Sequence, residues 1–447
     1  MNLKGILLGF CMLLGLTSLG QENSAIKRLI TGSWEGAIII KNAYQKIEVD
    51  FSERNGDLFA LQIMDEWHPT FGEFEVPVTI DSNQNIHFNS GYGPVTFDID
   101  AKNLELIGEV DSEDSVYVHL KKVPRKPASP YQVDKVMIES GDIQLSGHLH
   151  LPINNPTKTV VILVGGRGCF ADLTEHNLYA KFLREYGIAV LAYQKRGTGE
   201  SSGDCSLATI EDLANDVRFV KSYLEAHDEQ FETIGVLGIS AGGWTMTKAE
   251  ENVDFDFMIS VVGPSTSVKD QQLQSAKYGA EIYDLTQEAT NHLLEYTELL
   301  FLEKPKKKEF KRTQALLELA ENEGWIELLE ETDVANSLEE MKNLWVVRHN
   351  FDPELVLRNF SNPFLALYGE RDWIVPVTEN TDLLLEYFAE TPELLTTVNV
   401  YNADHGMEME SRLVQLESGL SYRHFYRVSP EVRIEIVEFL ALHGYIE

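Results

Sequence analysis

The sequence predicts an α/β fold with a mostly parallel sheet, helices on both faces and a helical cap insertion, preceded by a smaller all-β domain. Three observations predict it. Residues 30–123 consist of short segments separated by turns, and apolar and polar side chains alternate along each segment, as in antiparallel sheets. From residue 133 onward, apolar runs alternate with helical stretches, as in parallel sheets covered by helices. Between about 264 and 360 the strands stop, and the chain becomes helical and highly charged.

The composition limits the classes of protein to consider. Hydrophobic residues make up 43% of the 447 residues, which excludes a disordered chain and provides for a large core. Asp and Glu number 71 against 37 Lys and Arg, so the formal net charge is −34. Because such a chain repels phosphate groups, we expect no nucleic-acid partner and no attraction to anionic lipid.

Residues 1–20 are interpreted as a secretory signal peptide. Lys4 gives a positive start, and small residues precede a cleavage point before Gln21. The apolar run 5–16 is too short for a bilayer, which requires about 20 residues. Cys11 lies inside this run, where lipid attachment is not expected. No later segment resembles a membrane helix, so we expect an exported, periplasmic or extracellular protein without stable membrane insertion.

The domain of residues 21–123 is expected to contain eight strands. They are Trp34–Lys41, Lys46–Phe51, Leu58–Met64, Phe74–Ile80, Asn85–Phe88, Val95–Ile99, Leu104–Glu109 and Val116–Lys121. This spacing leaves a meander, a sandwich and a small barrel open. The domain carries no catalytic constellation. Its aromatic residues Trp34, Trp67 and Tyr92 suit sugar binding, although core packing is the commoner fate of such side chains.

A proline-rich, basic linker at 124–132 leads into the second domain, residues 133–447. Its expected strands are Lys135–Glu139, Leu145–Leu151, Thr159–Val164, Ile188–Tyr193, Thr233–Leu237, Phe257–Val262, Pro363–Tyr368 and Thr397–Tyr401. Its expected helices are Leu173–Tyr186, Ile210–Ala226, Ala241–Ala249, Thr286–Phe301, Phe310–Asn322, Trp325–Glu331, Ser337–Val347, Thr378–Phe388 and Pro430–His443. The continuous apolar run at 159–164 is typical of a strand buried on both faces.

The motif Gly-x-Ser-x-Gly at 238–242 follows a predicted strand and opens a predicted helix. This context predicts a nucleophile elbow, in which a sharp turn exposes the hydroxyl of Ser240. Gly238 and Gly242 allow the close approach of chain segments that such a turn requires. The helix start also directs N–H groups toward an anion formed there.

A serine hydroxyl needs a base to act as a nucleophile. We expect His405 to be this base and Asp372 to be its acid partner. Asp372 and His405 each follow a predicted strand, at the edge of the sheet where sites of open α/β folds form. Taken alone, Asp372 also fits a helix cap, and His405 also fits a residue of a turn. Together with Ser240, their chain order predicts a Ser-His-Asp triad that requires no metal or cofactor.

These motifs resemble the α/β-hydrolase superfamily. Within it, the sequence is similar to bacterial carboxylesterases of the dienelactone-hydrolase and prolyl-oligopeptidase-like branch, some of which carry a small N-terminal domain. Ala192–Ser201 is similar to the "Y-D-x-R-G-x-G-x-S" turn, and Tyr368–Pro376 to the "G-x-x-D-x-x-V-P" acid loop. The resemblance covers about 133–447 and implies a serine hydrolase that forms an acyl-enzyme. Residues 196–201 are interpreted as a structural turn.

The sequence departs from the family pattern in one loop. Gly165 stands where the family usually has the histidine of a His-Gly pair. The loop still permits a main-chain donor, and we expect an oxyanion hole formed by the N–H groups of Arg167 and Ala241. The Arg167 side chain either points into the pocket, where it would favour an acidic substrate, or faces solvent.

Two further residue pairs suggest a disulfide bond and a metal site. Cys169 and Cys205 lie in loops that follow adjacent strands, so they either form a disulfide or remain separate thiols. His148 and His150 share one strand face, but no third ligand stands at a suitable spacing, so we predict no metal site.

A carboxylesterase acting on a small-molecule ester is the first functional hypothesis. A serine peptidase acting on short peptides comes second, and a thioesterase third. An inactive hydrolase-fold binding protein is the alternative from another class. The insertion at 264–360 is expected to cover the pocket and to set substrate size.

Overall fold

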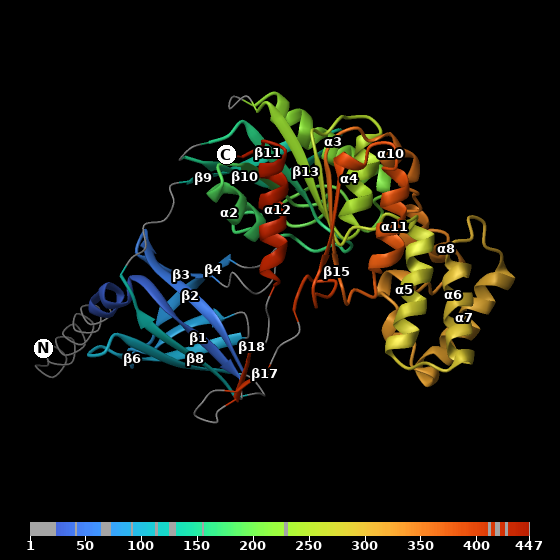
Figure 1. Cartoon of the computed structure of the whole chain (residues 1–447). Helices are drawn as coiled ribbons and strands as arrows, with labels where there is room; N and C mark the ends of the chain where they lie inside the picture. Colours follow the sequence, from blue (N-terminus) through green and yellow to red (C-terminus); the bar gives the residue numbers. More distant parts are fainter. Residues whose placement is uncertain are drawn as a thin grey trace, which may run out of the picture. The chain divides into compact units, whose positions relative to one another are not determined.

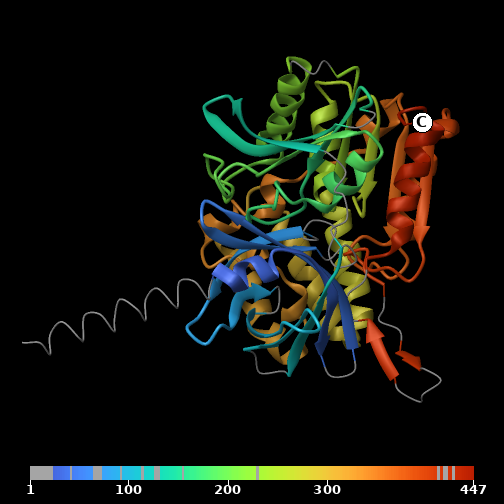
Figure 2. The same cartoon turned by 90° about the vertical axis from the view of Figure 1, so that its left-hand side faces the viewer.

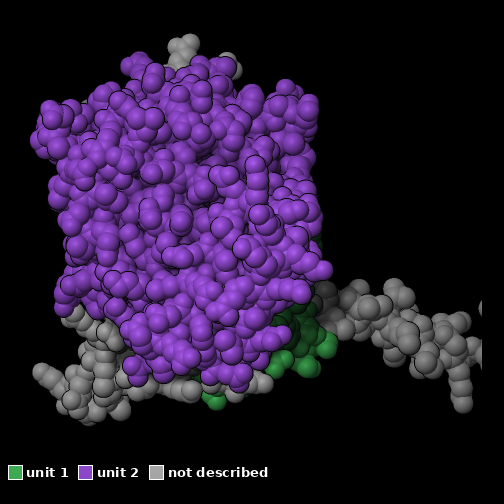
Figure 3. Space-filling view, turned by 90° about the vertical axis from the view of Figure 1, so that its right-hand side faces the viewer, with its two compact units in different colours: residues 1–128, 410–427 green, residues 129–409, 428–447 purple. Residues whose placement is uncertain are grey.

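The computed structural model describes residues 24–40, 43–63, 73–90, 93–111, 115–124, 131–153, 156–227, 231–409, 413–415, 421–424 and 428–446. The chain divides into two compact units, residues 1–128 with 410–427 and residues 129–409 with 428–447 (Figures 1 and 3). The signal peptide predicted at 1–20, most of the linker, Trp67 and Tyr92 lie outside the described residues.

The first unit contains a closed eight-stranded antiparallel barrel. Each strand pairs with the next, and β1 pairs with both β2 and β8, which closes the ring. The strands are β1 (Gly32–Ile40), β2 (Ala43–Arg54), β3 (Asp57–Ile63), β4 (Glu73–Ile80), β5 (Ile86–Ser90), β6 (Gly93–Asp100), β7 (Glu105–Val110) and β8 (Val116–Lys122). Of the three forms left open by the sequence, the structure is therefore a barrel.

The barrel interior is a packed core. Inward side chains alternate with exposed ones along the strands, so that Val116, Val118 and Leu120 of β8 are buried. The rings of Phe88 and Phe97 stack with centroids 4.9 Å apart. Trp34 is only 1% exposed and donates its indole N–H to the Ile30 carbonyl at 2.7 Å. Trp34 is therefore a core residue and offers no surface for a sugar.

Two late strands join the barrel unit. β18 (Ser421–His424) pairs in parallel with the first residues of β2, and β17 (Leu413–Gln415) pairs with β18. Both segments were expected in the second domain, residues 133–447, but the structure assigns them to the first unit. The cause is an open edge: β3 pairs with β2 only from Glu48 to Arg54, so the start of β2 is available to another strand.

The second unit is built on an eight-stranded sheet of order β16-β15-β14-β13-β11-β12-β10-β9. Its strands are β9 (Tyr131–Ser140), β10 (Ile143–Pro152), β11 (Thr159–Val164), β12 (Ala189–Tyr193), β13 (Thr233–Ile239), β14 (Met258–Val261), β15 (Phe364–Gly369) and β16 (Leu395–Val400). From β11 to β16 the strands are parallel, whereas β9 and β10 are antiparallel. Because β9 begins at Tyr131, the predicted linker is shorter than 124–132.

Helices cover both faces of this sheet (Figures 1 and 2). One apolar core joins the sheet to α3 (Ile210–Glu225), α4 (Gly242–Glu250), α10 (Glu354–Asn359) and α11 (Val377–Tyr387). The other core joins it to α2 (Leu178–Glu185) and α12 (Pro430–Leu442). All six residues of β11 are buried, as its continuous apolar sequence predicted.

The insertion has a separate apolar core that includes Leu293, Tyr296, Leu316 and Trp325. Its elements are α5 (Val268–Ile282), α6 (Gln287–Leu300), α7 (Lys307–Glu323), η1 (Ile326–Leu328), η2 (Glu331–Asp333), α8 (Leu338–Met341) and α9 (Trp345–Arg348). Two predicted helices are not continuous in the structure: 325–331 contains η1 and only the first residue of η2, and 337–347 contains α8 and most of α9. Helix α5 was not predicted from the sequence, although the side chain of Ser267 caps its start.

Among the helices of the described residues, none has the length and apolar character that a membrane span requires.

Candidate active site

Ser240 lies in the sharp turn between β13 and α4, in a left-handed backbone conformation with φ of +52°. This conformation is strained for a residue with a side chain. The turn persists because its neighbours are glycines in close contact. A Cβ at Gly242 would lie 2.3 Å from the Val164 carbonyl oxygen, and one at Gly238 would lie 2.7 Å from the Gly242 backbone. The Gly-x-Ser-x-Gly motif therefore forms a tight turn between β13 and α4.

The three residues of the predicted triad meet in one hydrogen-bonded chain. His405 Nε2 lies 2.9 Å from Ser240 Oγ, and His405 Nδ1 lies 2.8 Å from Asp372 Oδ2. The Asp372 carboxylate is buried, and its other oxygen accepts the N–H groups of Ile374 and Val375, both at 2.9 Å. These bonds fix the carboxylate in the orientation that faces His405.

The loop that carries His405 is organised by neighbouring carboxylates. Asp404 Oδ1 accepts the N–H groups of Gly406 at 2.9 Å and Glu408 at 3.0 Å. Glu370 Oε2 accepts the Asn402 N–H at 2.8 Å. Asp404 and Glu370 therefore shape the turn, and Asp372 is the carboxylate that contacts the imidazole.

The loop after β11 passes directly against Ser240. A Cβ at Gly166 would lie 3.3 Å from Ser240 Cβ and 3.1 Å from the Ile239 carbonyl oxygen. A Cβ at Gly165 would lie 2.8 Å from Asp172 Oδ2, so a side chain at this position requires Asp172 to move. Within the described residues, the main-chain N–H groups of Arg167 and Ala241 donate to no other residue.

The side chain of Arg167 does not face solvent, which was one of the two directions considered from the sequence, because it is only 19% exposed. Its Nη2 donates to Asp333 Oδ1 at 2.7 Å and also contacts the Thr332 hydroxyl. Its guanidinium carbon lies 4.2 Å from the centroid of the Trp345 ring. Arg167 therefore points toward the helical insertion and binds it.

Cys169 and Cys205 form a disulfide bond, with Cα atoms 5.7 Å apart. Of the two alternatives that the sequence left open, the structure has the bond. It joins the loop after β11 to the segment that follows β12. The loop that lies against Ser240 is thereby linked covalently to a second segment.

Lys195 is a residue of the site that the sequence analysis missed. Its Nζ donates to the carbonyl oxygens of Gly166 at 2.7 Å and Gly168 at 2.6 Å. Burial lowers the pKa of Lys195, and the Asp172 charge opposes this shift. Burial likewise raises the pKa of Asp172, which Lys195 opposes. The only signal in the sequence was the position of Lys195, two residues after the end of a buried strand.

The two histidines that resembled a metal pair bind Thr174 instead. His148 Nδ1 lies 2.8 Å from the Thr174 hydroxyl, and His150 Nε2 lies 2.7 Å from its carbonyl oxygen. Burial lowers the pKa of His150 to about 4, so this ring is neutral near pH 7. These contacts are structural.

Comparison with known proteins identifies the family. Residues 155–410, more than half of the chain, match the model of the family described as serine aminopeptidase, S33. The chain belongs to this S33 family. It is a serine hydrolase with the α/β-hydrolase fold, as the motifs around Ser240 and Asp372 implied.

Solved structures similar to this S33-family chain are distant in sequence. The esterase Pf2001 of Pyrococcus furiosus is 16% identical, with a TM-score of 0.45 over 71% of this chain and 96% of that one. The proline iminopeptidase of Mycobacterium smegmatis is 15% identical, with a TM-score of 0.42 over 69% and 98%. Est1E of Butyrivibrio proteoclasticus, determined with ferulic acid, is 18% identical, with a TM-score of 0.43 over 69% and 99%. The search of curated proteins found no match.

Proposed function

We propose that this serine hydrolase is an exported carboxylesterase that uses Ser240, His405 and Asp372 as a catalytic triad. The hydrogen-bonded chain from Ser240 Oγ through His405 to Asp372, with contacts of 2.9 and 2.8 Å, is the observation that carries the proposal. A base must lie within hydrogen-bond reach of the proton that it removes, and His405 Nε2 meets this requirement.

The reaction follows from these contacts. His405 Nε2 accepts the proton of Ser240 Oγ as this oxygen attacks the ester carbonyl. The N–H groups of Arg167 and Ala241 stabilise the resulting oxyanion. The intermediate collapses, His405 protonates the departing alcohol, and the acyl group remains on Ser240. Water, deprotonated by His405, then releases the carboxylic acid and restores Ser240.

Asp372 orients His405 and stabilises its charged form during these steps. The two N–H groups from residues 374 and 375 hold the second carboxylate oxygen, so the side chain has one orientation. Asp372 accepts from Nδ1 and therefore selects the imidazole tautomer protonated there, which leaves Nε2 free to accept the Ser240 proton.

The surroundings of Ala241 favour an apolar acyl group. Ala241 belongs to a cluster built from buried Ile210, Trp244 and Val268 and from partly buried aromatic rings. Those rings are Phe301, Trp345 and Phe351. An apolar acyl chain bound beside the oxyanion hole would replace water at these surfaces.

Hydrolysis of short peptides is the second candidate, and the match to the aminopeptidase family favours it. The same triad serves both reactions, because amides and esters share the tetrahedral intermediate. The two candidates differ in the leaving group, so substrates with one acyl group and either an alcohol or an amine leaving group distinguish them.

The test combines active-site labelling with substrate turnover. A fluorophosphonate probe should label the wild-type protein and not Ser240→Ala, whereas Ser206→Ala, which alters an exposed serine, should label normally. Turnover of p-nitrophenyl butyrate without release of p-nitroaniline from aminoacyl anilides supports the esterase. The reverse preference supports the peptidase, and a folded, unlabelled wild-type protein contradicts both.

Export is part of the proposal and rests on residues 1–20. The disulfide between Cys169 and Cys205 supports it, because such bonds persist mainly in oxidising compartments. N-terminal sequencing of the protein recovered from the native host should begin at Gln21. An intact start at Met1 in the cytoplasmic fraction would contradict export.

A further inference from the structure

We propose that Lys195 is a positioning residue that fixes the oxyanion hole. This inference rests on the proposed hydrolytic function and names a group that the motif comparison leaves without a role. Lys195 holds the peptide unit between Gly166 and Arg167 in one orientation. That unit carries the Arg167 N–H, the proposed donor to the oxyanion.

The Gly166 carbonyl and the Arg167 N–H belong to the same planar unit, and in a trans peptide they point in opposite directions. Lys195 Nζ binds the carbonyl side at 2.7 Å. The N–H is therefore directed away from Lys195, and it donates to no other residue within the described chain. Gly166 itself lies against Ser240.

The loop needs such a constraint because it is rich in glycine. Gly165, Gly166 and Gly168 lack the side chains that restrict backbone rotation, and Gly168 adopts φ of +108°. A loop of this kind has several peptide orientations of similar energy. The second bond of Lys195, to the Gly168 carbonyl at 2.6 Å, holds the loop on the other side of Arg167.

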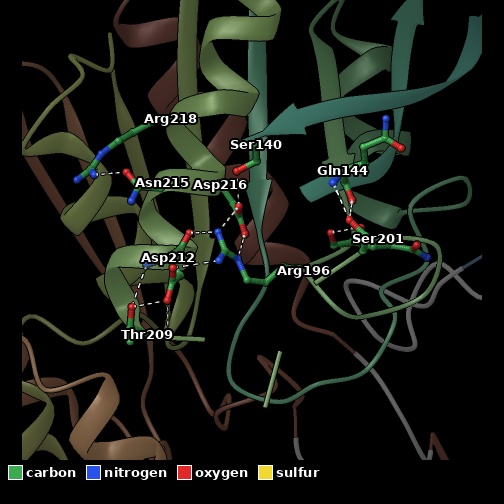
Figure 4. A network of polar contacts seen from close by, with 11 residues as sticks. Ser140, Gln144, Arg196, Ser201, Thr209, Asp212, Asn215, Asp216 and Arg218 are labelled. Atoms are coloured by element: carbon green, nitrogen blue, oxygen red, sulfur yellow. Dashed lines mark hydrogen bonds and ion pairs between the residues drawn. The ribbon is translucent and has the colours of Figure 1, made fainter. Parts of the chain in front are cut away.

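Hydrogen bonds hold the backbone turn that carries Lys195 in one conformation. Its own carbonyl accepts the N–H and the hydroxyl of Thr198, at 3.1 and 2.8 Å. The next residue, Arg196, binds both carboxylate oxygens of Asp216 and also contacts Asp212 (Figure 4). Ser140 donates to the same Asp216 carboxylate at 2.6 Å. This network holds the turn, so the lysine cation has a defined position.

Burial of this cation indicates that its contacts matter. Lys195 is only 6% exposed, and an ammonium group is costly to remove from water unless it is paired or hydrogen-bonded. Its neighbours are the two carbonyls, the Asp172 charge and the Phe170 ring, whose centroid lies 4.9 Å away. A positive charge on the carbonyl side also polarises the peptide, which strengthens the Arg167 N–H as a donor.

The experiment compares Lys195→Met, which keeps the volume of the side chain, with Lys195→Gln, which keeps an uncharged N–H donor. Lys221→Met is the matched control, because Lys221 pairs with Glu225 on α3. Four quantities are measured: the rate of fluorophosphonate labelling, the affinity for butyl trifluoromethyl ketone, the affinity for butyl methyl ketone, and the thermal midpoint. The trifluoromethyl ketone forms an oxyanion on Ser240, whereas the neutral methyl ketone has the same alkyl group and reports ground-state binding.

We expect Lys195→Met to slow labelling and weaken ketone binding by roughly 10- to 100-fold, since loss of a whole oxyanion donor costs about 10²–10³-fold. Lys195→Gln should fall between this variant and the wild type, and the affinity for the methyl ketone should change little. Wild-type labelling rates in either folded variant overturn the inference. An equal loss of affinity for the two ketones also overturns it, because that result indicates a general structural role.

Failure of the proposed function is distinguishable from failure of this inference. If the folded wild-type protein is not labelled, the hydrolytic proposal is wrong. Hydrogen exchange of residues 164–170 then tests Lys195 without any activity. Faster exchange in Lys195→Met than in Lys221→Met means that Lys195 holds the loop, and equal exchange means that it does not.

Discussion

Arg167 and Asp333 form an ion pair of 2.7 Å between the loop beside Ser240 and the helical insertion. Their side chains are 19% and 7% exposed, so the pair is largely shielded from solvent. The backbone N–H of Arg167 is also the proposed oxyanion donor. One residue therefore connects the insertion to the chemistry at Ser240, and a disturbance of the insertion should reach the oxyanion hole.

The substitution Asp333→Asn should lower both stability and activity. Removing one charge leaves the Arg167 guanidinium buried without its partner, which we expect to cost about 2–3 kcal/mol of unfolding free energy. The rate of acyl-enzyme formation should fall as the loop loses its anchor. Urea unfolding and p-nitrophenyl butyrate kinetics measure the two effects.

Glu295→Gln is the matched control for this prediction. Glu295 pairs with Arg312 in the same insertion, but both side chains are more than 40% exposed. Solvent screens such a pair, so its loss should cost less than about 1 kcal/mol. Equal effects of the two substitutions would show that shielding does not distinguish these pairs.

Gly242→Ala should disrupt the elbow. The new Cβ would lie 2.3 Å from the Val164 carbonyl oxygen, so either α4 or β11 must move. We expect a loss of about 3 kcal/mol in stability and of most labelling of Ser240. Gly141→Ala is the comparison: its φ of +59° is strained, but nothing lies within 4 Å of the added Cβ, so about 1 kcal/mol is expected. Similar thermal midpoints for the two variants would contradict the packing argument.

Reduction of the disulfide should destabilise the protein and slow labelling. The bond joins residues 36 positions apart, and loss of a loop constraint of this size corresponds to about 4 kcal/mol in the chain-entropy model. Release of Cys169 also frees the loop beside Ser240. The double variant Cys169→Ser with Cys205→Ser should reproduce both effects and show no further response to reductant. A thermal midpoint that reductant leaves unchanged would contradict the prediction.

Glu250→Gln should stabilise the protein at pH 8 and have little effect at pH 4. Burial raises the pKa of Glu250 to about 7, the Phe255 N–H opposes this, and the nearby Asp254 and Asp256 charges add to the rise. The folded state therefore holds a proton that the unfolded chain releases above about pH 4.5, so stability decreases as the pH rises from there to about 7. Gln keeps an acceptor for the Phe255 N–H and removes the charge. A thermal midpoint difference between variant and wild type that does not grow with pH would contradict the shift.

Most of the elements and the three candidate residues Ser240, Asp372 and His405 could be predicted from local patterns. Eight alternating segments became the eight barrel strands, and the glycines at 238 and 242 indicated the elbow. The helices of the insertion were less accurate. The residues at 325–347 form short 3₁₀ and helical turns around Trp325, because packing in the core of the insertion overrides their helical propensity.

The sequence by itself determined most of the elements and their order, and it singled out Ser240, Asp372 and His405 as candidates for serine hydrolysis. Hydrophobic period, glycine placement and chain order are local properties, so they can be read without a structure. Only the tertiary structure decided that the barrel closes through β1 and β8, that β18 joins it, that Arg167 faces Asp333, and that Lys195 binds the loop beside Ser240. Each of these depends on contacts between residues far apart in the chain, and a local pattern carries no information about which distant groups meet.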